Sequence, residues 1–353
     1  MMKALLIHNP VAGNRGFDAE LRQTAALLVE RGWELLDIER THGHGDATAY
    51  ARKAVAAGCD VLFVVGGDGT AAQAVDGLIG SQTALAVLPG GTGNVLARQL
   101  NLPTPGALRL HPILDAAELL LDGQTRRVDV GRVSGSGGGG NPRHFLCWGG
   151  VGFDARLNQA VNQDMERKKR LGFLAFILSG LSTLSEFVGT SAIVRVDGAR
   201  VSRRMLMLVA NNIQLYGVFF RMAPTAILDD GYLDICIFQG RHPARALLHL
   251  AHIALNRHIQ DPRVDIYRAR RVEIRTARTM PVHVDGDYIG DTPVVMEVVP
   301  RALSLVVPHC APANLFVDGS GMMGPETTWE WMVRRAREAQ DAILGRSADQ
   351  AQA

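Results

Sequence analysis

The 353-residue chain lacks the features that mark several common classes of protein. It has only 4 cysteines and no CxxC pair, so neither a disulfide framework nor a cysteine-rich zinc site is predicted. Cys59, Cys147 and Cys236 lie in apolar runs and are expected to be reduced core thiols. The net charge of +2 gives no basic excess of the kind that nucleic-acid binding requires. A strand pattern begins almost at the first residue, so we expect no signal peptide and a cytoplasmic protein.

No stretch has the length and apolar purity of a transmembrane helix. The most apolar helical segment, residues 171–188, is short for a span and contains three serines and Glu186. A basic run at residues 167–170 precedes it. Two interpretations of this segment stay open: a helix packed on the rest of the chain, or one whose basic flank touches anionic headgroups.

Glycine, by contrast, is abundant, with 38 residues, and it gathers after predicted strands. Residues 61–65 form an apolar, valine-rich run that predicts a buried parallel strand. The run ends in Gly-Gly-Asp-Gly-Thr at residues 66–70, and a helix is predicted from Ala71. Such a turn presents backbone amides to a phosphate. It is neither a Walker loop nor a GxGxxG fingerprint, and a tight turn without a ligand is the alternative.

Two more predicted strands end in loops of small residues. Residues 4–8 run into Asn-Pro-Val-Ala-Gly-Asn, and residues 84–88 run into Pro-Gly-Gly-Thr-Gly-Asn before a helix that begins at Val95. In an open parallel sheet these loops meet at the carboxyl edge of the strands, where ligands bind. The three loops together predict a polyphosphate site.

The pattern along the chain predicts two domains of different class, and the hydrophobic content of 47% is enough for two cores. Strands and helices alternate from residue 3 to about 121, which predicts a doubly wound α/β domain. After Gly123 strands dominate, and we expect an antiparallel β-sandwich or barrel-like domain with helical insertions near 155–188 and 243–258. Residues 134–142 predict a flexible surface loop. Histidines 249, 252 and 258 predict a solvated helix face rather than a metal site.

The motifs together resemble the diacylglycerol kinase and sphingosine kinase superfamily of lipid kinases, closest to its soluble bacterial branch. The resemblance covers roughly residues 3 to 316. GGDGT alone is shared with NAD kinases and phosphofructokinase-like enzymes. The segments that carry the resemblance are NPVAG at 9–13, GGDGT at 66–70, PGGTGNVLAR at 89–98, the aromatic-to-GFDA segment at 145–155, the AP-x-A…DG-x-LD stretch at 223–234 and the Val-Asp-Gly-Asp motif at 284–287.

This resemblance implies a division of the chain and a set of nucleotide contacts. We expect a nucleotide domain over 1–123, a lipid-substrate domain over 124–300, a segment over 301–324 that returns to the first domain, and a polar helix and tail over 325–353. Thr41 is assigned to the nucleotide by resemblance only, and a simple loop residue is the alternative. The expected ATP-binding residues are Asn9, Pro10, Val11, Ala12, Gly13, Thr41, Gly66, Gly67, Asp68, Gly69, Thr70, Thr92 and Asn94.

Carboxylates near these loops are the expected Mg²⁺ ligands. Asp68 is the leading candidate, and Asp129 matches a family carboxylate placed near the nucleotide metal, with a polar strand residue as the alternative. Many relatives carry an Asp directly after the residue equivalent to Asn94, whereas this chain has Val95, which puts part of the acidic network in doubt.

A second, structural Mg²⁺ site is implied at the Asp-Asp-Gly loop. On the family pattern Asp230 would provide its side chain, and Ile227 and Tyr232 would provide main-chain carbonyls. Oxygen-only ligation suits a hard cation. The alternative is an ordinary turn.

The general base is expected from the Val-Asp-Gly-Asp motif. Relatives usually have Glu at the position of Asp287, so the shorter side chain leaves either Asp285 or Asp287 as the base. The alternative is a plain hairpin turn, for which Asp-Gly is a common pair.

The whole sequence therefore predicts an ATP- and Mg²⁺-dependent lipid kinase, with diacylglycerol as the favoured acceptor and phosphatidic acid as its product. Sphingoid bases, monoacylglycerol and phosphatidylglycerol stay open as acceptors. The resemblance implies a peripheral protein at the inner face of the membrane that meets its lipid there; no nucleic acid is expected, and a homodimer is left open. The rivals are an NAD kinase-like enzyme with a soluble acceptor, and a non-catalytic regulator that binds nucleotide or lipid.

Overall fold

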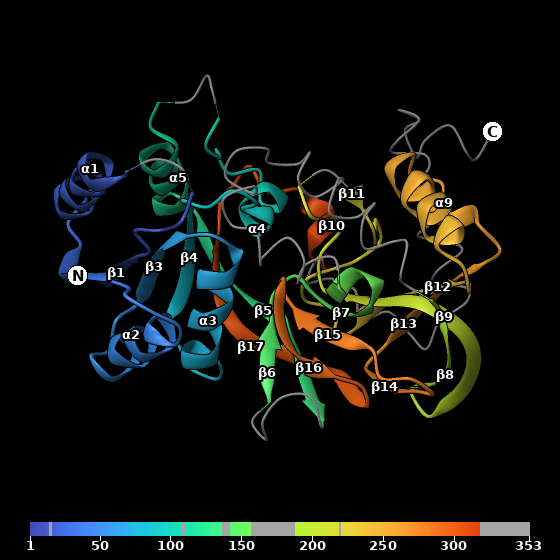
Figure 1. The fold of residues 1–353 in the computed structure, drawn as a ribbon. Helices are drawn as coiled ribbons and strands as arrows, with labels where there is room; N and C mark the ends of the chain where they lie inside the picture. The colour runs from blue at the N-terminus through green and yellow to red at the C-terminus, as the bar shows by residue number, and fades with distance from the viewer. Residues whose placement is uncertain (14–15, 107–109, 136–141, 157–187, 219, 318–353) are drawn as a thin grey trace, which may run out of the picture.

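The computed structural model describes residues 1–13, 16–106, 110–135, 142–156, 188–218 and 220–317. Within these ranges most strands join one large mixed sheet, with an α/β region at one end and an antiparallel region at the other (Figure 1). The predicted combination of an α/β domain with a β-sandwich-like domain is confirmed.

The first domain is a parallel sheet between two layers of helices. Strands β1 (Lys3–His8), β2 (Glu34–Arg40), β3 (Val61–Gly66) and β4 (Ala84–Pro89) run parallel in the order β4-β3-β1-β2. Helices α1 (Asp18–Glu30) and α5 (Pro112–Leu121) cover one face, and α2 (Asp46–Ala56) and α3 (Asp68–Leu78) cover the other (Figure 1). Strands β3 and β4 are buried throughout, as their apolar runs require.

Helix α3 begins three residues earlier than the sequence predicts, at Asp68 instead of Ala71. Gly67 is extended, with φ −91° and ψ −179°, and occupies the N-cap position. Asp68 then stands in the first turn, where a negative charge is favoured by the helix dipole. Residues 68–70 of the predicted glycine turn therefore belong to the helix. The short helix α4 (Val95–Gln99) begins where it is predicted.

The second domain is antiparallel. A hairpin of β10 (Leu215–Tyr216) and β11 (Phe220–Arg221) stands apart from the main sheet, and the domain also carries helix α9 (Pro243–Ala254) and the 3₁₀ turns at His258–Gln260 and Ala313–Leu315. Its strands in the main sheet are β5 (Gln124–Gly135), β6 (Arg143–Phe145), β7 (Trp148–Gly152), β8 (Thr190–Val196), β9 (Ala199–Asn211), β12 (Leu233–Gln239), β13 (Val264–Ala269), β14 (Arg271–Thr276), β15 (Pro281–Val284), β16 (Asp287–Asp291) and β17 (Val294–Val307).

Two long strands connect the domains. β5 and β17 pair along nearly their whole length, with an irregularity between Val299 and Leu303. Beyond it, Leu305 of β17 pairs in parallel with Leu85 of β4. The predicted boundary at residue 123 therefore falls just before β5, and the one at residue 300 falls inside β17. The exact boundaries stay predictions.

Several predictions concern single residues or short segments. Cys59, Cys147 and Cys236 are buried free thiols, as predicted, whereas Cys310 is exposed. In the parts of the chain that the structure describes, no helix is long and apolar enough to cross a membrane. The core of the predicted glycine loop (136–141), nearly all of the insertion at 155–188 and the tail from 318 lie outside the described residues.

Candidate active site

The three small-residue loops meet at the carboxyl edge of β1, β3 and β4. They approach so closely that side chains would not fit between them: a Cβ on Gly91 would lie 2.5 Å from Cα of Gly67, and a Cβ on Gly13 would lie 2.5 Å from the Gly90 carbonyl oxygen. A hydrogen bond of 3.0 Å from Asn9 Nδ2 to Thr70 Oγ1 joins the first loop to the second. The predicted convergence of the loops is confirmed.

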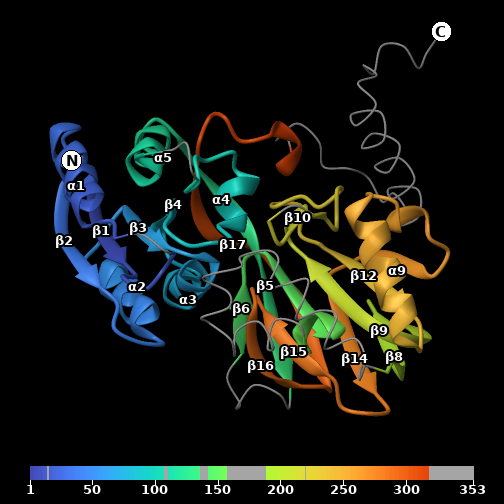
Figure 2. The ribbon, with the colours of Figure 1, turned by 45° about the horizontal axis from the view of Figure 1, so that its top comes forward.

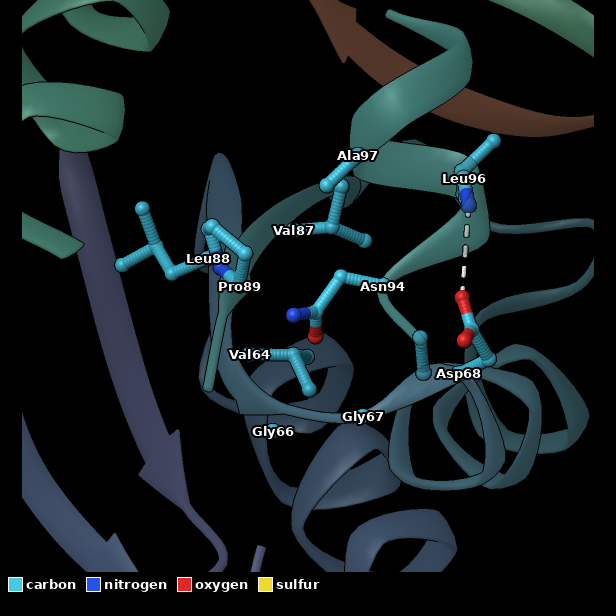
Figure 3. A pocket seen from close by; sticks show the side chains of 11 residues that line it. Val64, Gly66, Gly67, Asp68, Val87, Leu88, Pro89, Asn94, Leu96 and Ala97 are labelled. Carbon is cyan, nitrogen blue, oxygen red and sulfur yellow. Dashed lines mark hydrogen bonds between the residues drawn. The ribbon is translucent and has the colours of Figure 1, made fainter. Parts of the chain in front are cut away.

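A pocket lies among these loops, and its walls come from β3, β4, α3 and α4 (Figure 3). The polar side chains in the lining are Asp68 and Asn94, while Val64 and Val87 are among its apolar members (Figure 3). Asn94 is buried and holds its own loop, because its Oδ1 accepts from Gly91 N at 2.8 Å and its Nδ2 donates to Gly91 O at 2.7 Å. Its amide thus helps to shape the loop.

Asp68 joins two of the loops through its carboxylate. Oδ1 accepts from the backbone N–H groups of Val95, at 2.7 Å, and Leu96, at 3.2 Å, and so caps the N-terminus of α4. Figure 3 shows the bond to Leu96. Oδ2 is turned toward Gly93, where a Cβ would lie 2.9 Å from it. Burial raises the pKa of Asp68, and the two amides and Arg98 oppose that shift.

The other predicted nucleotide residues lie at the same edge or bonded to it. Thr41 follows β2 and is buried, with its N–H donating to His8 O at 2.9 Å. Thr92 is exposed on the third loop. Val11 N donates to Asn9 Oδ1 at 3.1 Å, which fixes the first loop around residues 9–13. These residues are brought together, although their contact with a nucleotide stays a prediction.

The turn between β15 and β16 places the second domain over the first. A Cβ on Gly69 would lie 3.9 Å from both carboxylate oxygens of Asp287, and nothing else outside helix α3 and the neighbouring residues would come within 4 Å of it. Asp287 is partly exposed. An acidic side chain of the second domain therefore faces the glycine turn of the first.

Asp285, the other predicted base, binds three backbone N–H groups. Its Oδ1 accepts from Cys147 N and Trp148 N, each at 2.9 Å, and its Oδ2 accepts from Leu146 N at 2.7 Å. Burial and the nearby charge of Asp68 raise the pKa of Asp285 to about 7, although the three amides favour its charged form. Asp285 has φ +46°, the left-handed conformation in which Asp is one of the better-tolerated residues.

Sequence reasoning missed a buried pair beneath this turn. His283 Nε2 lies 2.5 Å from Asp154 Oδ2, with side chains 0% and 2% exposed. Gly286 N lies 3.2 Å from His283 Nδ1, so Nδ1 accepts that bond and Nε2 carries the proton toward Asp154. The pair thereby ties the GFDA segment to the Asp-Gly-Asp turn. The only sequence signal was that Asp154 lies inside the GFDA segment and that His283 directly precedes the Val-Asp-Gly-Asp motif.

The one carboxylate predicted for a second metal is already paired. Asp230 Oδ2 lies 3.0 Å from Arg268 Nη2, and its Oδ1 accepts from Tyr232 N at 2.9 Å. Burial raises the pKa of Asp230 to about 7 in spite of Arg268, whose guanidinium lies 4.1 Å from the centre of the Tyr232 ring. Ile227 is buried beside this loop. A cation here would have to compete with Arg268, and the site stays a prediction.

Asp129 is also held by backbone groups. Its Oδ1 accepts from Arg301 N at 2.7 Å and its Oδ2 from Gly231 N at 2.6 Å, and the side chain is buried. Burial raises its pKa to about 6. Its described partners therefore belong to the 229–231 loop and to β17, and its role near a nucleotide metal stays a prediction.

The donor set fits one cation at the glycine loops better than a cluster of carboxylates. Among the described residues no group of three or more His, Cys, Asp or Glu side chains is arranged to hold a metal ion. Asp68 Oδ2 is turned toward Gly93 on the third loop, while the hydrogen bonds from Val95 N and Leu96 N both go to Oδ1. One carboxylate oxygen beside a phosphate site suits Mg²⁺, which usually takes one or two carboxylates plus phosphate oxygens.

Two family models match the chain, and together they span most of it. The diacylglycerol kinase catalytic domain matches residues 3–133, and the YegS C-terminal NAD kinase beta sandwich-like domain matches residues 149–307. Similar curated proteins include a diacylglycerol kinase of Bacillus subtilis (strain 168), 29% identical over 311 residues that cover 87% of this chain and 97% of the relative. One from Mycobacterium tuberculosis (strain ATCC 25618 / H37Rv) is 28% identical over 308 residues, covering 87% and 96%.

A solved structure gives the same result for the fold. A crystal structure from Bacillus anthracis str. Sterne, whose name assigns it provisionally to the diacylglycerol kinases, aligns with a TM-score of 0.71. It is 26% identical, and the alignment covers 88% of this chain and 96% of that one.

Proposed function

Because this chain belongs to the bacterial diacylglycerol kinase family, whose members phosphorylate a lipid hydroxyl, we propose that its substrates are ATP, taken up with Mg²⁺, and diacylglycerol, and that its product is phosphatidic acid. One observation carries the proposal beyond the family: the Asp287 carboxylate of the second domain faces Gly69 in the glycine turn of the first. A base and a phosphate site on opposite walls are what phosphoryl transfer to a hydroxyl needs.

The three loops bind and orient the triphosphate in this proposal. Backbone amides of the glycine turns point at phosphate oxygens, and the N-terminus of α3 adds its dipole. Asp68 keeps the second and third loops in register through the amides of Val95 and Leu96. Mg²⁺, when bound, would neutralise phosphate charge, and Asp68 Oδ2 is the oxygen we assign to it.

Asp287 is the base in this proposal. The acceptor oxygen forms a new bond to the γ-phosphorus as the bond from phosphorus to the β,γ-bridging oxygen breaks, and ADP leaves. The proton of the acceptor hydroxyl passes to the Asp287 carboxylate. Asp285 positions the turn instead, because its two oxygens already accept three backbone N–H groups.

The two rival functions make different demands. An NAD kinase-like enzyme would phosphorylate a soluble ribose, and a regulator would bind nucleotide without turnover. The matched diacylglycerol kinase catalytic domain and the curated relatives favour a lipid kinase over both. Val95, in place of the acid that many relatives carry, is buried, and its N–H is bound by Asp68, so the loop keeps its shape without that acid.

The test is an acceptor panel. Purified protein is incubated with radiolabelled ATP, Mg²⁺ and mixed micelles that each carry one acceptor: diacylglycerol, monoacylglycerol, a sphingoid base or phosphatidylglycerol, with NAD in a parallel soluble reaction. We expect label in phosphatidic acid only, and none when EDTA replaces Mg²⁺. Label in NAD, or ATP binding without turnover of any acceptor, would contradict the proposal.

A further inference from the structure

Helix α9 exposes an unbroken apolar stripe. In this 12-residue helix Leu247 is 45% exposed and Leu248 41%, and Leu255, directly after the helix, is 64% exposed. These leucines recur at three-to-four-residue spacing with exposed alanines, so they share one face. The exposed positions from residue 244 to 255 are Ala244, Leu247, Leu248, Ala251, Ala254 and Leu255.

The opposite face of α9 is fixed to the second domain. Ala246 and Ile253 are buried there. His249 is also buried, contrary to the solvated histidine face that the sequence predicts, and its Nε2 lies 2.8 Å from Gln239 O. His252 Nδ1 lies 3.0 Å from Asp261 Oδ2. These bonds fix the rotation of the helix about its own axis, so the apolar stripe faces away from the second domain.

The charged residues that flank the stripe along the sequence have one sign. Residues 240–260 contain three arginines and no Asp or Glu. Arg241 before the helix and Arg257 after it are exposed, at the two ends of the stripe. The nearest acid in the sequence, Asp261, is buried against the histidines. An apolar face with basic ends is complementary to a surface that is apolar inside and anionic outside.

The β10–β11 hairpin lies between the stripe and the helix that follows the third glycine loop. The β10–β11 hairpin stands between α4 and α9 in both views (Figures 1 and 2). Leu215 N of β10 donates to Gln99 Oε1 of α4 at 2.8 Å, and Met222 O, next to β11, lies 2.9 Å from His258 Nε2 beyond α9. Arg221 of the hairpin is exposed. The hairpin thus links α9 to the helix that ends the third glycine loop.

We propose that the α9 stripe is the surface through which this protein docks on an anionic phospholipid bilayer. The proposal rests on the proposed function, because an enzyme of diacylglycerol must reach an acceptor that stays in the membrane. A second copy of the chain fits the stripe poorly. An antiparallel pairing of two α9 helices would set Arg241 of each copy beside Arg257 of the other, and a 12-residue helix offers little area for a stable dimer.

The experiment measures binding and turnover separately. Sedimentation with phosphatidylglycerol vesicles compares the wild type with Leu247→Gln/Leu248→Gln and with Arg241→Glu/Arg257→Glu. Leu36→Gln is the matched control, because Leu36 is 38% exposed on β2 at the far end of the sheet. Turnover of a short-chain diacylglycerol in detergent micelles and far-UV circular dichroism are measured on the same proteins.

We expect the leucine variant to bind vesicles about tenfold more weakly or worse, since each lost apolar side chain removes burial in the bilayer. The arginine variant should lose a similar factor at low salt and less at high salt. Both should keep their turnover in micelles, and Leu36→Gln should keep both properties. Wild-type vesicle binding by either α9 variant would overturn the proposal, as would a dimer that only the leucine variant disrupts. If the wild type phosphorylates no lipid in micelles, the proposed function is wrong. The vesicle-binding comparison would still test whether α9 is the docking surface.

Discussion

The variant Gly69→Ala is expected to change the stability of the protein and its kcat in different ways. A Cβ at Gly69 meets no atom outside its own helix and neighbouring residues closer than the Asp287 oxygens, at 3.9 Å, so the methyl group fits without a clash. Gly69 lies in the first turn of α3, where Ala is preferred to Gly by up to about 1 kcal/mol. The variant should therefore be at least as stable as the wild type.

Its activity should nevertheless fall. The added methyl group occupies the space between the glycine turn and Asp287, where the acceptor hydroxyl has to lie about 2.6–3.2 Å from its base. Displacing reacting groups by about 1 Å costs roughly 10²-fold in rate. We expect kcat to fall by about that factor while the melting temperature stays at or above the wild-type value.

A second glycine of the same helix is the control. A Cβ on Gly77 would lie 2.6 Å from both Ala51 Cβ and Thr48 O on α2, so Gly77→Ala overpacks the contact between the helices. That variant should lose about 1–3 kcal/mol of unfolding free energy and keep its kcat below its melting temperature. Thermal unfolding and initial rates on micellar diacylglycerol measure both quantities. Wild-type kcat in Gly69→Ala would refute the assignment of this space to the reacting groups.

Three further predictions follow from the buried polar contacts. Asp154→Asn should lower kcat about tenfold and leave ATP affinity unchanged, because it weakens the bond to His283 under the Asp-Gly-Asp turn that carries the proposed base; an unchanged kcat would contradict this. Asp285 keeps its proton up to about pH 7 in the folded protein, whereas it releases the proton near pH 3.8 in the unfolded chain. Its contribution to the free energy of unfolding, on the order of 4 kcal/mol, is therefore complete below about pH 4 and is lost as the pH rises to 7. Urea titrations at several pH values should show that Asp285→Asn flattens this part of the pH profile, and an unaltered profile would rule the account out. Arg268→Met should cost about 3–5 kcal/mol, because Asp230 is left buried without its cation, and Mg²⁺ should restore part of the melting temperature; no recovery would mean that Asp230 cannot take a metal.

Local patterns were sufficient to predict that the three glycine loops converge. Apolar runs that end in glycine loops fix the parallel strands, and the rule that such loops meet at one edge then brings Asn9, Gly67 and Gly91 together. The start of α3 at Asp68 was missed, since a glycine-rich turn gives no signal that the helix has already begun.

Long-range polar contacts were not predictable from the sequence. His283 and Asp154 are 129 residues apart, and Asp285 is 137 to 139 residues from the three amides that it binds. No periodicity encodes which strands become neighbours in an antiparallel sheet, so the roles of Asp285 and Asp287 stayed undivided. The folded structure shows that their contacts differ, and their roles stay a prediction.

The most direct test of the account is the rate of phosphoryl transfer by Asp287→Asn beside Asp285→Asn. Initial rates with radiolabelled ATP and micellar diacylglycerol are measured with ATP affinity for both variants. Loss of a general base should lower kcat in Asp287→Asn by about 10²- to 10⁴-fold with ATP affinity nearly unchanged. Asp285→Asn should lose less kcat and more stability. Wild-type kcat in Asp287→Asn would contradict the central claim that the base lies over Gly69.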